Sequence, residues 1–199
     1  MNQDEFDAVE QRVSVTVDLS ARFPTWPFPA VSGYAVLYEF DQFLSPAFGG
    51  VVDLLMGAHG DTSVSAINPE PSYIRDSYGY YPAFTLGIPA VGSRYGEAMA
   101  WEPNDDPTGA LEFASNGFAV CGSTGRWAAF GQRDWEVALV VSEKPPGPWL
   151  DSEVAWFAAD IDLSSIRSPA GYGMPLGAPE IAAFQRGIRS RGSGPLVSR

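Results

Sequence analysis

The sequence predicts a single α+β domain on a mainly antiparallel sheet, with a β-meander, two short helices and long Gly/Pro-rich loops. The chain has 199 residues, the size of one domain, and 45% of them are apolar, which is enough for a buried core. It holds 21 glycines and 17 prolines, which interrupt helices and disfavour a helical bundle. Three β-prone runs between residues 118 and 141 indicate the meander.

The two ends of the chain are expected to lie outside the domain, which we place at residues 13–190. Residues 1–12 are polar and acidic and are expected to form a flexible lead-in, and residues 191–199 a flexible basic tail. Residues 13–19 alternate apolar and polar side chains, the period-two pattern of a half-buried strand. Residues 23–29 place three prolines among three aromatics and predict a loop that packs through its rings.

The next segments carry clearer patterns. The apolar run 34–40 suits either a strand or the first turns of a helix, and we favour the strand. Residues 46–56 predict a helix, with Ser45 as its cap and apolar residues at three- and four-residue spacing. Residues 63–67 alternate again and predict a strand, which the turn at 68–69 ends.

The middle of the chain gives little periodic signal. Residues 70–96 are rich in tyrosine, glycine and proline, and residues 101–109 follow the rules of a polar surface loop. The runs 118–121, 126–130 and 135–141 are separated by short glycine-containing connections, as in antiparallel strands.

Two further elements are predicted near the C-terminal end. Residues 154–163 are a strand candidate. Residues 179–189 predict a short helix with Ile181, Phe184 and Ile188 on one face.

The charge balance restricts the class of partner. The chain has 24 acidic and 12 basic residues, a net charge of −12, which repels nucleic acid and anionic membranes and favours a basic protein or a cationic ligand. Cys121 is the only cysteine, lies in an apolar run and is expected to be a buried structural thiol. The N-terminus lacks the features of a signal peptide, so a cytoplasmic protein is expected.

No specific catalytic motif is present, and we expect no cofactor and no metal. His59, the only histidine, is either a general base or a helix-end residue in a turn, and the second reading is favoured. Asp160 and Asp162, like Asp134 and Glu136, share one face of a predicted strand. Such pairs could bind a hard cation or act in glycoside hydrolysis, but they are more often the solvated side of a strand.

The aromatic surplus is the more informative feature. Aromatic residues make up 13% of the chain, and tyrosine and tryptophan are enriched at protein interfaces. The alternative for the stretch 73–84 is that its rings fill the core under loops. The residues expected to contact a partner are Tyr80, Tyr81, Asp105, Asp106 and Glu136.

One segment carries a resemblance. Residues 122–140, GSTGRWAAFGQRDWEVALV, place a serine and a glycine before a tryptophan, then a glycine turn and an acidic and aliphatic returning strand. This pattern resembles a hairpin of small bacterial proteins, including immunity proteins of polymorphic toxin systems. The resemblance implies a cytosolic protein that covers a cognate toxin, such as a basic nuclease, and needs no catalytic residue.

Three functions remain open at this point. The favoured one is a non-catalytic immunity or antitoxin-type inhibitor that occludes a basic toxin, so the chain is more likely to be a binding protein than an enzyme. A hydrolase would need His59, or Asp160 and Asp162, in a concave pocket with convergent polar groups. A structural component of a larger assembly would self-associate through its tyrosines. The sequence does not fix the oligomeric state.

Overall fold

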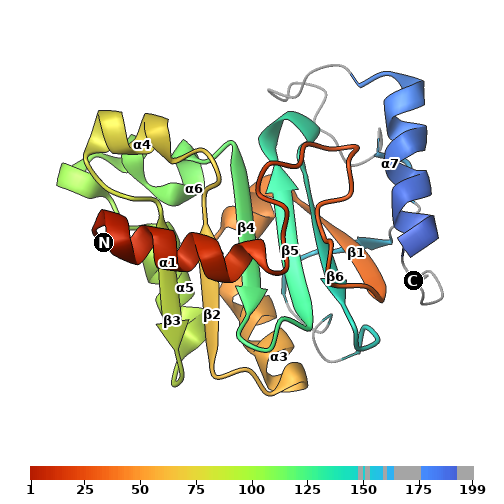
Figure 1. Ribbon diagram of the computed structural model, residues 1–199, viewed down its shortest axis with the longest axis horizontal. Helices are drawn as coiled ribbons and strands as arrows, with labels where there is room; N and C mark the ends of the chain where they lie inside the picture. The colour runs from red at the N-terminus through yellow and green to blue at the C-terminus, as the bar shows by residue number, and fades with distance from the viewer. Residues whose placement is uncertain (148–149, 151–152, 159–160, 164–175, 192–199) are drawn as a thin grey trace.

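A computed structural model describes residues 1–147, 150, 153–158, 161–163 and 176–191. Its centre is an antiparallel seven-stranded sheet with the order β3-β2-β4-β5-β6-β1-β7 (Figure 1). The strands are β1 Tyr34–Glu39, β2 Ser63–Ile67, β3 Ala83–Gly87, β4 Gly117–Gly122, β5 Trp127–Gln132, β6 Val137–Ser142 and β7 Phe157–Ala158. The α-helices are α1 Gln3–Ser14, α2 Phe40–Leu44, α3 Phe48–His59, α4 Pro71–Tyr78, α5 Val91–Met99, α6 Leu111–Ala114 and α7 Ala178–Arg191. Three 3-10 turns complete the described elements: η1 Pro103–Asp105, η2 Pro107–Gly109 and η3 Arg133–Trp135.

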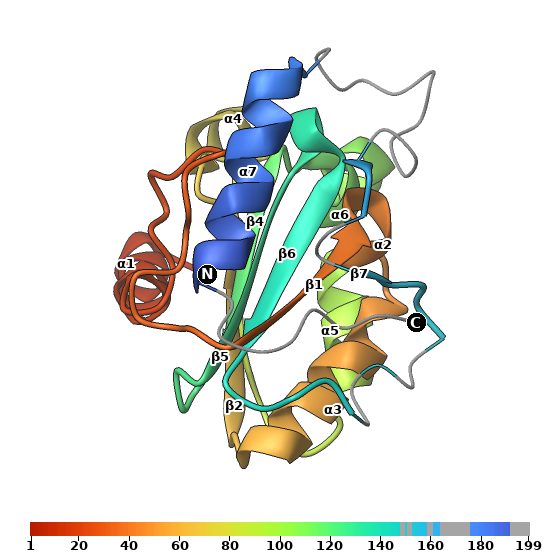
Figure 2. The same cartoon turned by 90° about the vertical axis from the view of Figure 1, so that its right-hand side faces the viewer.

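Helices cover both faces of the sheet, so the domain has three layers. In Figure 2, α1 and α7 lie on one side of the sheet and α2, α3 and α5 on the other. The alternation of the strands supplies both interfaces, since Val36 and Tyr38 of β1 pack toward α3 while Ala35 and Leu37 pack toward the opposite side. Each face therefore has its own apolar core.

The α+β class, the antiparallel sheet and the meander are confirmed. β4, β5 and β6 pair in sequence order, and β1 and β2 flank them at the predicted positions. The predicted helix 46–56 is shifted: α3 begins at Phe48, and the side chain of Ser45 bonds to the carbonyl of Gln42 instead of capping α3. The predicted C-terminal helix is α7, in which Phe184 and Ile188 are buried.

The flexible N-terminal lead-in is a wrong prediction. Residues 3–14 form α1, which begins with a capping box between Asn2 and Glu5 and buries Phe6, Val9 and Val13 against the sheet. The predicted strand at 13–19 is wrong for the same reason, because its alternation belongs to the helix end and a following turn. The acidic residues that suggested disorder lie on the solvent side of an amphipathic helix.

The prediction of two short helices is also wrong, since seven α-helices lie in the described part of the chain. Residues 70–96, which showed no period, form α4, β3 and α5. Of the strand predicted at 154–163 only β7 is present among the described residues, and Asp160 lies outside them. In the described residues, no helix has both the length and the apolar character needed to cross a bilayer.

Candidate functional site

The segments 69–81 and 101–116, named here the α4–α6 surface, join β2 to β3 and α5 to β4 at one end of the sheet. Prolines start its short helices: Pro71 opens α4, Pro103 opens η1 and Pro107 opens η2. Asn104 and Asp105 adopt positive φ angles of 55° and 59°. Asn and Asp tolerate this conformation better than other side chains, which explains their place at the tip of this loop.

Tyrosine hydroxyls fix the two segments to each other. The Tyr80 hydroxyl donates to the carbonyl oxygen of Gly109 at 2.6 Å, and the Tyr78 hydroxyl lies 3.1 Å from the Thr108 hydroxyl. The Tyr80 ring also meets the Trp101 ring edge-on, with 5.0 Å between centroids. Burial raises the pKa of Tyr80 to about 12. Tyr80 is therefore an internal support of this surface, half-buried beneath it.

The α4–α6 surface carries exposed aromatic side chains. Tyr73, Trp101 and Phe113 are 59%, 52% and 63% exposed, and they are the aromatic members of the small set of large hydrophobic residues exposed in the described chain. The other three members, Met1, Val15 and Ile88, come from other segments. A large aromatic side chain left in water is a costly arrangement for a monomer and a common one at an interface.

Carboxylates lie between these aromatics in sequence. Glu102, Asp105 and Glu112 are at least partly exposed, and the chain has no lysine or arginine between Arg94 and Arg126. The pKa of Glu112 is raised, first by partial burial and then by the negative charge of Glu102. Two like charges therefore act on each other here. Arg133 reaches this segment, where its Nη2 donates to the backbone carbonyl of Glu112 at 3.1 Å, but its ion pair is with Asp41.

Two arginines at the α4–α6 surface already have carboxylate partners on it. Arg75 pairs with Asp76 at 3.0 Å, and Arg22 pairs with Glu70. Asp106 has an internal role, because its carboxylate accepts from the backbone N–H and the hydroxyl of Thr108 and so caps η2.

A pocket of about 320 Å³ opens between the start of α4 and the end of α6. It is lined by residues 68–73, Ala114 and Asn116, so an exposed ring (Tyr73), a carboxylate (Glu70) and amide side chains face one space. Its volume could hold one long side chain of a partner or a small molecule. The arrangement offers recognition chemistry and no nucleophile–base pair.

The five residues predicted to contact a partner do not form one set. Tyr80, Asp105 and Asp106 belong to the α4–α6 surface. Tyr81 turns toward α1: its hydroxyl donates to Gln3 Oε1 at 2.6 Å and its ring lies 5.4 Å from that of Phe6.

Glu136 follows η3 in the connection between β5 and β6, with a φ of 56°. The pairing of Asp134 with Glu136 on a strand face is wrong, because Asp134 lies in the turn that η3 forms. Trp101 and Phe113 were not predicted as contact residues. The available signal was that each is an isolated large aromatic residue in a polar segment.

His59 lies at the opposite end of the sheet and is buried, with 6% of its surface exposed. Its Nε2 is 2.8 Å from Ser142 Oγ, and its Nδ1 has no hydrogen-bond partner among the described residues. Ser142 Oγ is buried too and lies within hydrogen-bond distance of the backbone N–H and carbonyl of Lys144. Burial lowers the pKa of His59.

Asp61, two residues from this histidine, does not orient it. Its carboxylate accepts from Trp127 Nε1 at 2.7 Å, from the Thr124 N–H at 2.6 Å and from the Ser123 hydroxyl at 3.3 Å. The three residues His59, Ser142 and Asp61 therefore lack the relay of a hydrolytic triad, in which the acid bonds to the second ring nitrogen. Neither Asp61 nor Ser142 could be assigned to this end of the sheet from sequence.

The other candidates within the described residues form no catalytic group. Asp162 is exposed, and its predicted partner Asp160 lies outside the described residues. The described residues contain no group of three His, Cys, Asp or Glu side chains that could hold a metal ion. Cys121 is buried as predicted, and burial raises the pKa of its thiol.

Comparison with known proteins adds no assignment. No family model, no curated protein and no solved structure matches this chain.

Proposed function

We propose that the protein is a non-catalytic binding protein of the immunity or antitoxin type. It would act in the cytoplasm by covering a basic partner, such as a bacterial toxin, with its α4–α6 surface. One observation carries the proposal: exposed aromatic and acidic side chains occur together on this surface. The aromatics are Tyr73, Trp101 and Phe113, and the carboxylates of residues 102–112 have no lysine or arginine beside them in sequence.

The aromatic and the acidic side chains have separate roles in binding. Aromatic side chains bury a large rigid area at low entropic cost and supply most of the energy of many interfaces. Carboxylates without compensating cations speed the approach of a basic partner and select against acidic ones. A lysine or arginine of the partner would relieve the repulsion between Glu102 and Glu112. The free energy that this repulsion costs the free protein would then add to the affinity.

The pocket between α4 and α6 could receive one side chain of the partner. A partner's arginine or lysine side chain entering it would meet the Tyr73 ring and the Glu70 carboxylate. Glu70 already pairs with Arg22 across an exposed contact, which contributes little to stability and can be exchanged.

A hydrolase has less support. His59 is the only histidine of the chain, and its hydrogen-bond partner is the Ser142 hydroxyl. Both residues are buried, and the Ser142 hydroxyl also bonds to the backbone of Lys144. A substrate would have to open the end of the sheet to reach them. Asp162 is exposed and belongs to neither described pocket.

The proposal is tested by affinity capture from lysate of the source organism, followed by mass spectrometry. The test variant is Glu102→Gln/Asp105→Asn/Glu112→Gln, and its control is Asp4→Asn/Asp7→Asn/Glu10→Gln on the exposed side of α1. Both triple variants change the net charge from −12 to −9. We expect one stoichiometric basic protein with the wild type and the control, and its loss with the test variant.

Equal retention by both variants would contradict the proposal, because it would show that overall charge and not this surface attracts the partner. Retention of the protein's own copies alone would favour the self-assembling alternative.

The aromatic contribution is tested with Trp101→Ala. Since interface tryptophans often cost 2 kcal/mol or more when truncated, the affinity for the captured partner is expected to fall about 30-fold. Isothermal titration calorimetry gives the value, with Val15→Ala, an exposed aliphatic outside the α4–α6 surface, as the control. An unchanged affinity in Trp101→Ala would exclude Trp101 as an anchor.

A further inference from the structure

Strand β3 is an edge of the sheet, with β2 on one side and no described strand on the other. Two backbone hydrogen bonds fix which of its residues face β2: Asn68 N–H donates to Pro82 O at 2.9 Å, and Ile88 N–H donates to Thr62 O at 3.0 Å. In an antiparallel ladder, backbone groups alternate between the two sides. The intervening residues 83, 85 and 87 therefore direct their N–H and C=O groups outward.

Two of these outward groups are already bonded. The Ala83 N–H donates to the Tyr81 carbonyl at 2.9 Å, and Arg94 Nη1 donates to the Gly87 carbonyl at 3.0 Å. Within the described chain, no partner is present for the Ala83 carbonyl, the Gly87 N–H or either group of Thr85, which is exposed. Free groups of this kind on an edge are what strand addition uses.

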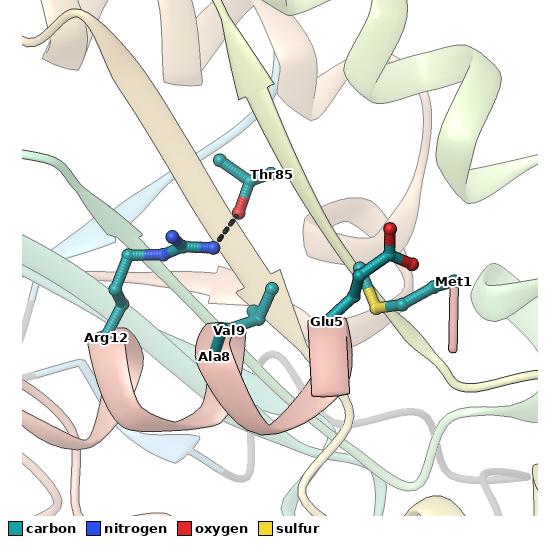
Figure 3. A pocket seen from close by; sticks show the side chains of 6 residues that line it. All are labelled: Met1, Glu5, Ala8, Val9, Arg12 and Thr85. Carbon is teal, nitrogen blue, oxygen red and sulfur yellow. Dashed lines mark hydrogen bonds between the residues drawn. The ribbon is translucent and has the colours of Figure 1, made fainter. Parts of the chain in front are cut away.

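An open groove of about 490 Å³ lies beside these groups, on the α1 side of β3 (Figure 3). Met1, Ala8 and Val9 give it apolar walls. Figure 3 shows Arg12 at one end of the groove, where its Nη2 donates to Thr85 Oγ1 at 3.0 Å, and Glu5 toward the other end. The Glu5 carboxylate accepts from the Asn2 N–H in the capping box and forms no ion pair with Arg12.

Arg12 and Arg94 differ from the other four arginines of residues 1–147. Arg22, Arg75, Arg126 and Arg133 each pair with a carboxylate. Arg12 and Arg94 have no ion pair within the described residues and bond only to a hydroxyl and a carbonyl, both on β3. In a protein of net charge −12, two cations without a carboxylate flank the same free edge.

We propose that β3 docks an extended segment of a partner chain that carries a carboxylate side chain, added as a further strand. Its backbone bonds to the free groups of Thr85 and its neighbours. Its side chain opposite Thr85 projects to the α1 side, where a carboxylate pairs with Arg12.

A second copy of this chain does not fit the edge as well. The sequence has no acidic residue between Asp76 and Glu97, so the β3 of a second copy would offer these arginines no carboxylate. This docking is independent of the role of the α4–α6 surface, and the two can fail separately.

The experiment uses three synthetic hexapeptides, blocked at both ends, of sequence Thr-Val-X-Val-Thr-Val with X as glutamate, glutamine or lysine. Binding is followed by two-dimensional NMR of the ¹⁵N-labelled full chain, with the Thr85 amide as the reporter. The net charge of the protein favours the lysine peptide, so a preference for the glutamate peptide can arise only from local cations.

We expect the glutamate peptide to bind most tightly and to shift and protect the Thr85 amide. Arg12→Gln/Arg94→Gln should weaken it about tenfold, since a hydrogen bond to a charged group is worth about 1.5 kcal/mol or more. The control is Arg75→Gln/Arg126→Gln, which makes the same charge change at two ion-paired arginines. It should leave the affinity for the glutamate peptide unchanged. Thr85→Pro removes the outward N–H, together with the hydroxyl that bonds to Arg12 and Ser65, and should abolish binding.

Equal binding of the three peptides, or binding that leaves the Thr85 amide unchanged, would overturn the proposal. So would a dimer in light scattering that Thr85→Pro dissociates, because the edge would then belong to a second copy. If Thr85→Pro fails to fold, the Thr85 amide and the arginine variants still decide the result.

Discussion

Carboxylates at the two ends of the sheet differ in whether the protein itself stabilises them. At the end where β4 and β6 finish, Asp61 is 7% exposed and accepts hydrogen bonds from three neighbouring residues. At the other end, Glu102 and Glu112 are at least partly exposed and repel each other. The first arrangement holds the chain in place, whereas the second lowers the stability of the isolated chain and is available to a partner.

The largest expected effect comes from Asp61→Ala. It would leave the buried Trp127 indole N–H without an acceptor and remove the acceptor of the exposed Thr124 N–H, at a cost of about 1–3 kcal/mol of unfolding free energy. Glu102→Ala, at the other end, should stay within about 0.5 kcal/mol of the wild type. Urea unfolding monitored by tryptophan fluorescence measures both. Similar losses of unfolding free energy in the two variants would contradict the difference between the two ends of the sheet.

His59 predicts a pH effect at the same end as Asp61. Because burial lowers the pKa of His59 in the folded state below its ordinary value of 6.5, the unfolded chain binds a proton more readily. The contribution of neutral His59 to stability is therefore full above pH 6.5 and is lost as the pH falls through the lowered folded-state pKa. Unfolding free energies measured between pH 7.5 and 5 should show this loss, and His59→Gln should remove it. If His59→Gln kept the wild-type pH dependence of the unfolding free energy, the pH effect would not come from His59.

The smallest expected effect is at Glu112. Its carboxyl pKa is raised, so ionisation costs stability, and this cost grows as the pH rises above 4.5. Glu112→Gln should therefore stabilise the free protein at pH 7, by less than about 0.5 kcal/mol because the group is largely solvated. In a double-mutant cycle with Glu102→Gln the gain should shrink, since the repelling partner is already neutral. Additive effects would show that the two glutamates do not interact.

Sequence patterns predicted the centre of the fold better than its surroundings. β2, β4, β5 and β6 were identified because alternation and glycine turns agree with the pairing that the sheet adopts. α1 was missed because its buried positions, Phe6, Val9 and Val13, are few and lie among acidic residues. α4 and α5 were missed because short helices in a region rich in glycine and tyrosine are stabilised by tertiary packing more than by local preference.

The candidate site was predictable only in part. Asp105 and Asp106 stood out as a polar loop, but their roles differ: Asp105 is exposed and Asp106 caps η2. Tyr81 was predicted as a contact residue together with Tyr80, but its hydroxyl bonds to Gln3 and its ring packs on Phe6. The approach of α6 to α4 is a long-range contact, and local sequence does not encode it.

We propose that the exposed carboxylates of the α4–α6 surface contact a basic protein. The most direct test is the affinity for the captured partner between 50 and 300 mM salt, for the wild type and for Glu102→Gln/Asp105→Asn/Glu112→Gln. We predict that affinity falls with salt in the wild type and that the triple variant binds more weakly with a shallower salt dependence. Equal affinities and equal salt dependences in the two proteins would contradict the claim.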